Sequence, residues 1–131
     1  GYIASLFGGW DAAISTLVCF MAMDYITGLI VAGVFHKSGK TESGALESGV
    51  GWRGLCRKGM TLAVVLVACW LDMVIGSNLL RDAAVIAFIA NETISIVENA
   101  GLMGVPVPPV IVQAIEVLKK KSELDNKKDG D

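Results

Sequence analysis

Long apolar segments alternate with short polar segments along this chain of 131 residues. Residues 12–35 contain a single charged side chain, Asp24, and residues 60–71 contain none. A helix of about 20 apolar residues is long enough to span the hydrocarbon core of a bilayer. The pattern therefore predicts two membrane-spanning helices, at about 12–35 and about 59–76.

Polar residues mark the ends of these two segments. Asp11 can cap the first helix, because its carboxylate can accept a hydrogen bond from a backbone amide of the first turn. Residues 36–58 are rich in Gly and Ser and carry five Lys or Arg, so we predict a polar loop there. Asp72 lies beside Trp70, a residue type common at membrane interfaces, and is predicted to be interfacial.

A third apolar segment, at about 83–99, differs because its polar residues repeat at the helical period. On a helical wheel at about 100° per residue these side chains fall within an arc of about 120°. A charged side chain at the bilayer centre costs about 2.5–3.5 kcal/mol, so such residues face other helices or water. The sequence thus predicts a third spanning helix with a polar face formed by Asn91, Glu92, Ser95, Glu98 and Asn99.

Asp24 is expected to join this polar interior from the first helix. Gly28 and Ala32 lie on the same side and form a small-xxx-small pattern, which lets another helix approach closely. No cation was identified within the predicted spans, so the acids are expected to be protonated, hydrogen-bonded or hydrated. Two interpretations stay open for the polar face: it lines water, or it joins helices by hydrogen bonds. Glu98 and Asn99 could equally cap the end of their helix.

The C-terminal part, residues 109–131, follows a segment that contains all three prolines. It predicts an amphipathic helix followed by a charged, disordered tail. Such a helix, with lysines 119–121 at the end of its apolar stripe, can lie on a membrane surface. The stripe consists of Val110, Ile111, Ala114, Ile115 and Leu118.

The distribution of Lys and Arg predicts the orientation. With three spans, the N-terminal segment carries none, the first loop five, the second loop only Arg81, and the C-terminal segment five. Because positive residues stay on the cytoplasmic side, we predict the N-terminus outside and the C-terminus inside. Arg53, Arg57 and Lys58 are expected to contact cytoplasmic lipid headgroups.

Composition supports an all-α integral membrane protein formed by a single domain. Apolar residues make up 53% of the chain, charged residues 18%, and the mean hydropathy is +0.60. Soluble domains usually carry about 25% charged residues.

Other chemistry is disfavoured by the pattern of reactive residues. The three cysteines form no CxxC pair, and His36 has no nearby cysteine, so neither a disulfide framework nor a metal site is expected. The tetrapeptide SGKT at 38–41 lacks the first glycine of a phosphate-binding loop, because position 34 is Val34. No His or Lys accompanies the carboxylates of the third helix as a catalytic partner. We predict no enzymatic activity, no cofactor and no nucleic-acid partner.

Three motifs occur in an order typical of one family: DYITGLIVA at 24–32, GWRGLCRK at 51–58 and NETISIVENAGLMGVPVP at 91–108. They resemble the small phage and toxin-secretion holins, which include the clostridial toxin-export holin. The resemblance covers most of the chain, and its third motif is the most specific.

The resemblance implies a three-span protein that self-associates in the bacterial cytoplasmic membrane and opens lesions at a set time. The openings would release an endolysin or a secreted toxin. Two alternatives stay open: a regulatory or scaffold subunit that oligomerises without opening, as an antiholin does, and a small ion channel.

Overall fold

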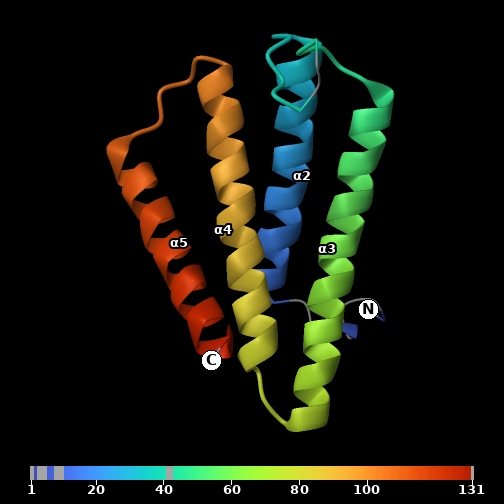
Figure 1. Ribbon diagram of the computed structural model, residues 1–131, viewed down its shortest axis with the longest axis vertical. Helices are drawn as coiled ribbons and strands as arrows, with labels where there is room; N and C mark the ends of the chain where they lie inside the picture. The colour runs from blue at the N-terminus through green and yellow to red at the C-terminus, as the bar shows by residue number, and fades with distance from the viewer. Residues whose placement is uncertain (1, 3–5, 8–10, 41–42, 131) are drawn as a thin grey trace.

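The structure, a computed structural model, describes residues 2, 6–7, 11–40 and 43–130. Within these ranges it is all-helical, which confirms the predicted class. Its four long helices, coloured from blue to red in Figure 1, are α2 (Ala12–Gly33), α3 (Ser48–Ile75), α4 (Leu79–Leu102) and α5 (Pro109–Gly130).

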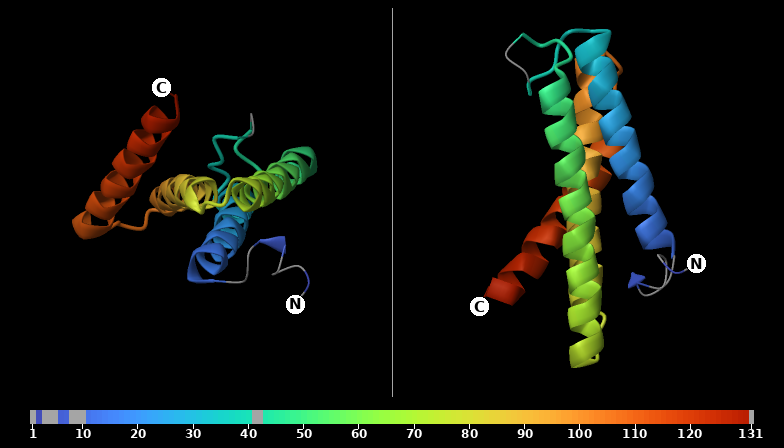
Figure 2. Two further views of the ribbon diagram at one scale, coloured as in Figure 1. Left: turned by 90° about the horizontal axis from the view of Figure 1, so that it is seen from below. Right: turned by 90° about the vertical axis from the view of Figure 1, so that its right-hand side faces the viewer.

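Helix α4 occupies the centre of the arrangement. It packs mainly against α2 and also against α3 and α5, whereas α2 and α3 contact each other little. Helices α2, α3 and α4 run alternately up and down, and α5 leans away from α4 (Figure 2). We call the end with the α3–α4 turn, residues 76–78, the turn end, and the opposite end, with the connection 34–47, the loop end.

Two helices, α2 and α3, are long and apolar enough to cross a membrane by length and composition. They correspond to the first two predicted spans. The third predicted span corresponds to α4, and its passage through a membrane stays a prediction.

Helix α3 begins at Ser48, well before the predicted start at residue 59. The predicted loop 36–58 is therefore too long. Tyr25 of α2 packs beside Gly51 and Gly54 of this segment: a Cβ at Gly51 would be 3.6 Å from the Tyr25 hydroxyl oxygen, an ordinary contact distance. The same hydroxyl donates a hydrogen bond of 3.2 Å to the Gly51 carbonyl oxygen. Packing against another helix thus outweighs the loop-like composition.

The α3–α4 turn is also shorter than predicted, because α4 begins at Leu79 and not at residue 83. Gly76 ends α3 in the left-handed conformation, with φ 71°, which glycine adopts without steric cost. Asp72 is buried within the protein, and its predicted place at a membrane interface stays a prediction. Its carboxylate accepts hydrogen bonds from the amides of Leu80 (3.1 Å) and Arg81 (2.7 Å) and from the Ser77 hydroxyl (2.8 Å). It thereby satisfies amides that the first turn of any helix leaves unpaired.

Arg81 ties the start of α4 to the N-terminal segment. Its Nε donates to the Phe7 carbonyl oxygen at 3.2 Å, and its guanidinium pairs with the Asp11 carboxylate at 2.8 Å. Asp11 also accepts a hydrogen bond of 3.0 Å from the Ile14 amide, which confirms the predicted cap of α2. The Ile14 amide, and then Arg81, lower the pKa of Asp11. These contacts therefore stabilise the fold above the ordinary pKa of an aspartate and are lost on acidification.

Beyond α4 the chain turns through residues 103–108, where Gly104 has a φ of 82°. Helix α5 then extends from Pro109 to Gly130, so it includes most of the tail that the sequence predicted to be disordered. Along its described side chains, Ile115 and Leu118 are half-buried, whereas Val110 and Ile111 are exposed.

The apolar core lies nearer the turn end. Its buried members come from all three packed helices: Ile14, Leu17, Met21, Val65, Cys69 and Val85. Many other large apolar side chains are exposed, above all on α3, where Val74 is 83% and Met73 71% exposed. Contiguous exposed apolar surface on this scale indicates contact with lipid or protein.

We expect Asp72→Ala to destabilise the α3–α4 turn, because two backbone amides of α4 and the Ser77 hydroxyl lose their acceptor. The midpoint of thermal unfolding in detergent micelles should fall, as followed by circular dichroism. The midpoint of Asp72→Asn should lie between those of Asp72→Ala and the wild type, since the asparagine amide keeps one acceptor oxygen. An unchanged midpoint in Asp72→Ala would contradict the assigned role.

Candidate functional site

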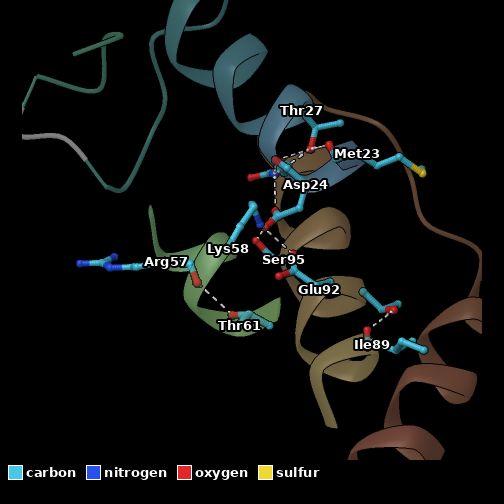
Figure 3. A network of polar contacts seen from close by, with 11 residues as sticks. Met23, Asp24, Thr27, Arg57, Lys58, Thr61, Ile89, Glu92 and Ser95 are labelled. Atoms are coloured by element: carbon cyan, nitrogen blue, oxygen red, sulfur yellow. Dashed lines mark hydrogen bonds and ion pairs between the residues drawn. The ribbon is translucent and has the colours of Figure 1, made fainter. Parts of the chain in front are cut away.

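A polar network joins the three packed helices on the loop-end side of the apolar core (Figure 3). Lys58 of α3 lies between two carboxylates of neighbouring helices. Its ammonium is 2.7 Å from Oδ2 of Asp24 on α2 and 3.0 Å from Oε2 of Glu92 on α4. One cation therefore connects all three helices. We call Asp24, Lys58 and Glu92 the triad.

Asp24 is the residue with the most hydrogen bonds in this network. Its Oδ1 accepts from the Ser95 hydroxyl and, at 3.2 Å, from the Asn99 side-chain amide. Asn99 also donates to the Asp24 carbonyl oxygen at 3.3 Å and to Oγ1 of Thr27 at 2.8 Å. Asp24, Glu92 and Asn99 are 5–7% exposed. In the described part of the chain, no buried side-chain nitrogen or oxygen lacks a partner.

The sequence builds this site by helical spacing. Glu92, Ser95 and Asn99 follow one another at intervals of three and four residues, which places them on one face of α4. Gly28 of α2 faces the same side, and a Cβ at this position would lie 3.9 Å from the Asn99 amide nitrogen. A residue no larger than alanine at position 28 thus lets α2 and α4 approach closely enough for Asn99 to reach the α2 backbone.

An open cavity of about 910 Å³ adjoins the network between α2, α3 and α4. All eleven predicted site residues line it. Those that lie outside the hydrogen-bonded network include Asn91 and Glu98, which are exposed. Arg53 and Arg57 are also exposed, and Arg57 points away from the network in Figure 3. The full set is Asp24, Gly28, Ala32, Arg53, Arg57, Lys58, Asn91, Glu92, Ser95, Glu98 and Asn99.

Lys58 corrects two expectations. The sequence identified no cation that could neutralise the buried acids, and it placed Lys58 among the headgroup contacts with Arg53 and Arg57. The structure turns Lys58 inward onto the triad, and its side chain is 17% exposed. One signal pointed this way: Lys58 directly precedes the uncharged part of α3, where its ammonium is within reach of acids on other helices.

The arrangement consists of one ammonium between two carboxyl groups. No cluster of three or more His, Cys, Asp or Glu able to hold a metal ion occurs among the described residues. The groups of the site can take up or release protons, and they can form hydrogen bonds and ion pairs with other helices or hydrogen bonds with water. Its two carboxylates and single ammonium make it the most charged part of the buried interior.

Long apolar helices, exposed apolar surfaces and a buried charged network together define a small helical membrane protein. Comparison with known sequences makes this specific. The family model of the bacteriophage holin family matches residues 1–120. A probable holin of Bacillus phage phi105 is 35% identical over 108 residues, which cover 82% of this chain and 74% of that protein.

Two uncharacterized bacterial proteins are similar at the same level. One, from Clostridium perfringens, is 38% identical over 121 residues, covering 91% of this chain and 84% of the relative. The other, from Listeria monocytogenes, is 38% identical over 124 residues, covering 94% of this chain and 83% of the relative. No solved structure matches the chain. The chain belongs to the bacteriophage holin family, as its three motifs predicted.

Removing the cation of the triad should destabilise the bundle. In Lys58→Met two buried carboxyl groups lose their shared partner, and we expect the free energy of unfolding to fall by about 3 kcal/mol. Combining Lys58→Met with Asp24→Asn should cost less than the sum of the two single changes, because the charge left behind is smaller. Unfolding in mixed micelles of increasing SDS content measures the free energy of unfolding for this double-mutant cycle. Lys37→Met, which removes an exposed cation, is the control. Additive effects would contradict a coupled triad.

Close approach of α2 and α4 should depend on the size of residue 28. Gly28→Ala should be tolerated, since its Cβ would meet Asn99 at ordinary contact distance. Gly28→Leu should push the helices apart and break the Asn99 hydrogen bonds. Disulfide cross-linking between cysteines introduced at neighbouring positions of α2 and α4 would report the separation. Equal cross-linking in both variants would argue against this packing.

Proposed function

We propose that this protein is a holin that self-associates in the bacterial cytoplasmic membrane and forms lesions through which an endolysin or a secreted toxin passes. Membership of the holin family over residues 1–120 carries the proposal. The relative of Bacillus phage phi105, named a probable holin, supports it. We assign the protein a permeabilising role and no enzymatic one.

The proposed topology has three spans, formed by α2, α3 and α4, with the N-terminus outside and the C-terminus inside. The charge distribution supports it, because nine of the eleven Lys and Arg then lie on the cytoplasmic side, with Lys58 inside the bundle and Arg81 at the turn end. The loop end would be cytoplasmic, so Arg53 and Arg57 would meet headgroups. With anionic lipid each such residue contributes about 1 kcal/mol. Helix α5 packs against α4 in the structure. In the proposed topology it would leave α4 and lie along the same membrane surface through its apolar stripe.

We propose that the polar face of α4 lines the wall of the lesion. In one copy, Asp24, Glu92, Ser95 and Asn99 bind one another and Lys58. When several copies associate, the same groups could instead face water along the wall of an opening, where hydration replaces the internal bonds. Asn91 and Glu98, already exposed, would extend that wall. The apolar surface of α3 would contact lipid.

One observation favours a second candidate, a subunit that oligomerises without opening. The network is fully satisfied within one copy, since every buried polar side-chain atom of the described residues has a partner. A protein in which this state never changed would act as an antiholin or a scaffold.

Inducible expression in a bacterium that also makes a cytosolic endolysin separates these roles. We expect abrupt depolarisation, reported by a potential-sensitive dye, followed at once by lysis. Endolysin expressed alone should cause neither. Depolarisation without endolysin release would support an ion channel, and membrane localisation without depolarisation would support the non-opening subunit; either outcome contradicts the holin proposal.

The proposed orientation has its own test. Single cysteines, in a background without the three native ones, can be placed next to Lys37 in the α2–α3 connection and next to Asn78 in the α3–α4 turn. A membrane-impermeant maleimide added to intact cells before triggering should label the turn and spare the connection. The reverse pattern would show that the orientation is wrong.

A further inference from the structure

The triad is unbalanced in charge. Two carboxyl groups, on Asp24 and Glu92, contact the single ammonium of Lys58, and both carboxyl side chains are less than 10% exposed. With all three groups ionised, the buried site would hold one uncompensated negative charge. An isolated charge in a poorly hydrated interior is costly, and such sites usually become neutral by taking up a proton.

Among the described residues, no other charged group lies within ion-pair distance of the triad. Five more charged residues line the adjoining cavity, but in the described part of the chain none forms an ion pair with the triad: Lys40, Glu47, Arg53, Arg57 and Glu98. Tyr25 of α2 also lines the cavity, and its hydroxyl donates to the Gly51 carbonyl. On α5, which packs against α4, the charged side chains at 116 and 119–121 are exposed and lie outside the cavity lining.

The two carboxyl groups differ in their hydrogen bonds. Asp24 accepts from three donors: the Lys58 ammonium at 2.7 Å, the Ser95 hydroxyl and the Asn99 amide. Within the part of the chain that the structure describes, Glu92 accepts from Lys58 alone, at the longer distance of 3.0 Å. Donors that converge on a carboxylate stabilise its ionised form. Asp24 is therefore the better anion, and Glu92 is the better place for a proton.

We infer that the packed bundle binds one proton, held on the carboxyl group of Glu92. This proton keeps the polar face of α4 packed against α2 and α3; we call this arrangement the closed state and the effect of the proton the lock. The inference rests on the proposed function as a holin. When the Glu92 carboxyl releases its proton to water in the adjoining cavity, the triad becomes a buried net negative charge. Hydration of both carboxylates then favours separation of α4 from α2 and α3. Proton uptake reverses the change.

Infrared spectroscopy of the full-length protein in lipid nanodiscs tests the proton directly. At neutral pH exposed carboxyl groups are ionised, so a carboxylic-acid C=O band reports a buried protonated group. We expect the wild type to show this band and Glu92→Gln to lack it. The matched control Glu116→Gln, which changes an exposed glutamate on α5, should keep it.

Asp24→Asn gives the sharper result. Once Asp24 carries no charge, Lys58 and Glu92 balance each other, so Glu92 should ionise and the band should disappear although Glu92 is present. A role of Glu92 in packing alone does not predict this loss. A wild type without the band, or a band that persists in Glu92→Gln or in Asp24→Asn, would overturn the inference.

Release of a trapped dye from vesicles of phosphatidylethanolamine and phosphatidylglycerol tests the lock. Wild-type release should increase with pH, by at most about tenfold per pH unit because one proton is involved. Glu92→Gln should stay at the low-pH rate throughout, and Glu116→Gln should follow the wild type. If the wild type releases dye with no pH dependence, the lock is wrong and the holin proposal stands. If none of the proteins releases dye, the holin proposal fails together with the lock, and the infrared result alone decides whether the proton is bound.

Discussion

The contact of one ammonium with two carboxylates from different helices is the interaction on which the rest of this bundle depends. Helices α2 and α3 contact each other little, so they are held together largely through α4 and through Lys58. A surface ion pair contributes little to stability, but a buried one is costly to break from one side. Because no described buried polar side-chain atom lacks a partner, the three helices have one arrangement in which all polar groups are satisfied.

This constraint explains how a helix with two glutamates and two asparagines can belong to an otherwise apolar bundle. Ion pairs and hydrogen bonds give α4 an interior partner for its polar face, while apolar contacts hold its other end in the core around Leu17 and Val65. The bundle therefore has an apolar core nearer the turn end and a charged network nearer the loop end. Both would serve the proposed function: the apolar core stabilises the state that accumulates, and the charged network supplies polar groups that gain hydration when that state ends.

Much of this was predictable from the sequence, because it depends on local pattern. The apolar segments of α2 and α3 follow from their length, and the polar face of α4 follows from its helical period. The Asp11 cap depends on neighbours within one turn. Even the cavity lining follows in large part, since Glu92, Ser95 and Asn99 share one face of a helix.

Contacts between distant segments were not predictable in the same way. Lys58 is 34 residues from both Asp24 and Glu92 along the chain, so no local pattern pairs them. The start of α3 was placed too late because its glycines resemble a loop, and the contact of this segment with Tyr25, on another helix, is not visible in the sequence. The hydrogen bonds of Asp72 were not predictable either, because two of its donors are backbone amides of the next helix, which no side-chain pattern reveals.

The contacts at the turn end also constrain how the bundle can move. Asp72, Arg81 and Asp11 fasten the starts of α2 and α4 and the end of α3 to one another, beside the apolar core. If α4 tilts about that end, its 24 residues form an arm of about 36 Å. Tilting this arm by about 15° would displace its loop end by roughly 9 Å, which follows from the same rise per residue. A small rotation that leaves the core packed would thus open a wedge that widens toward the charged end.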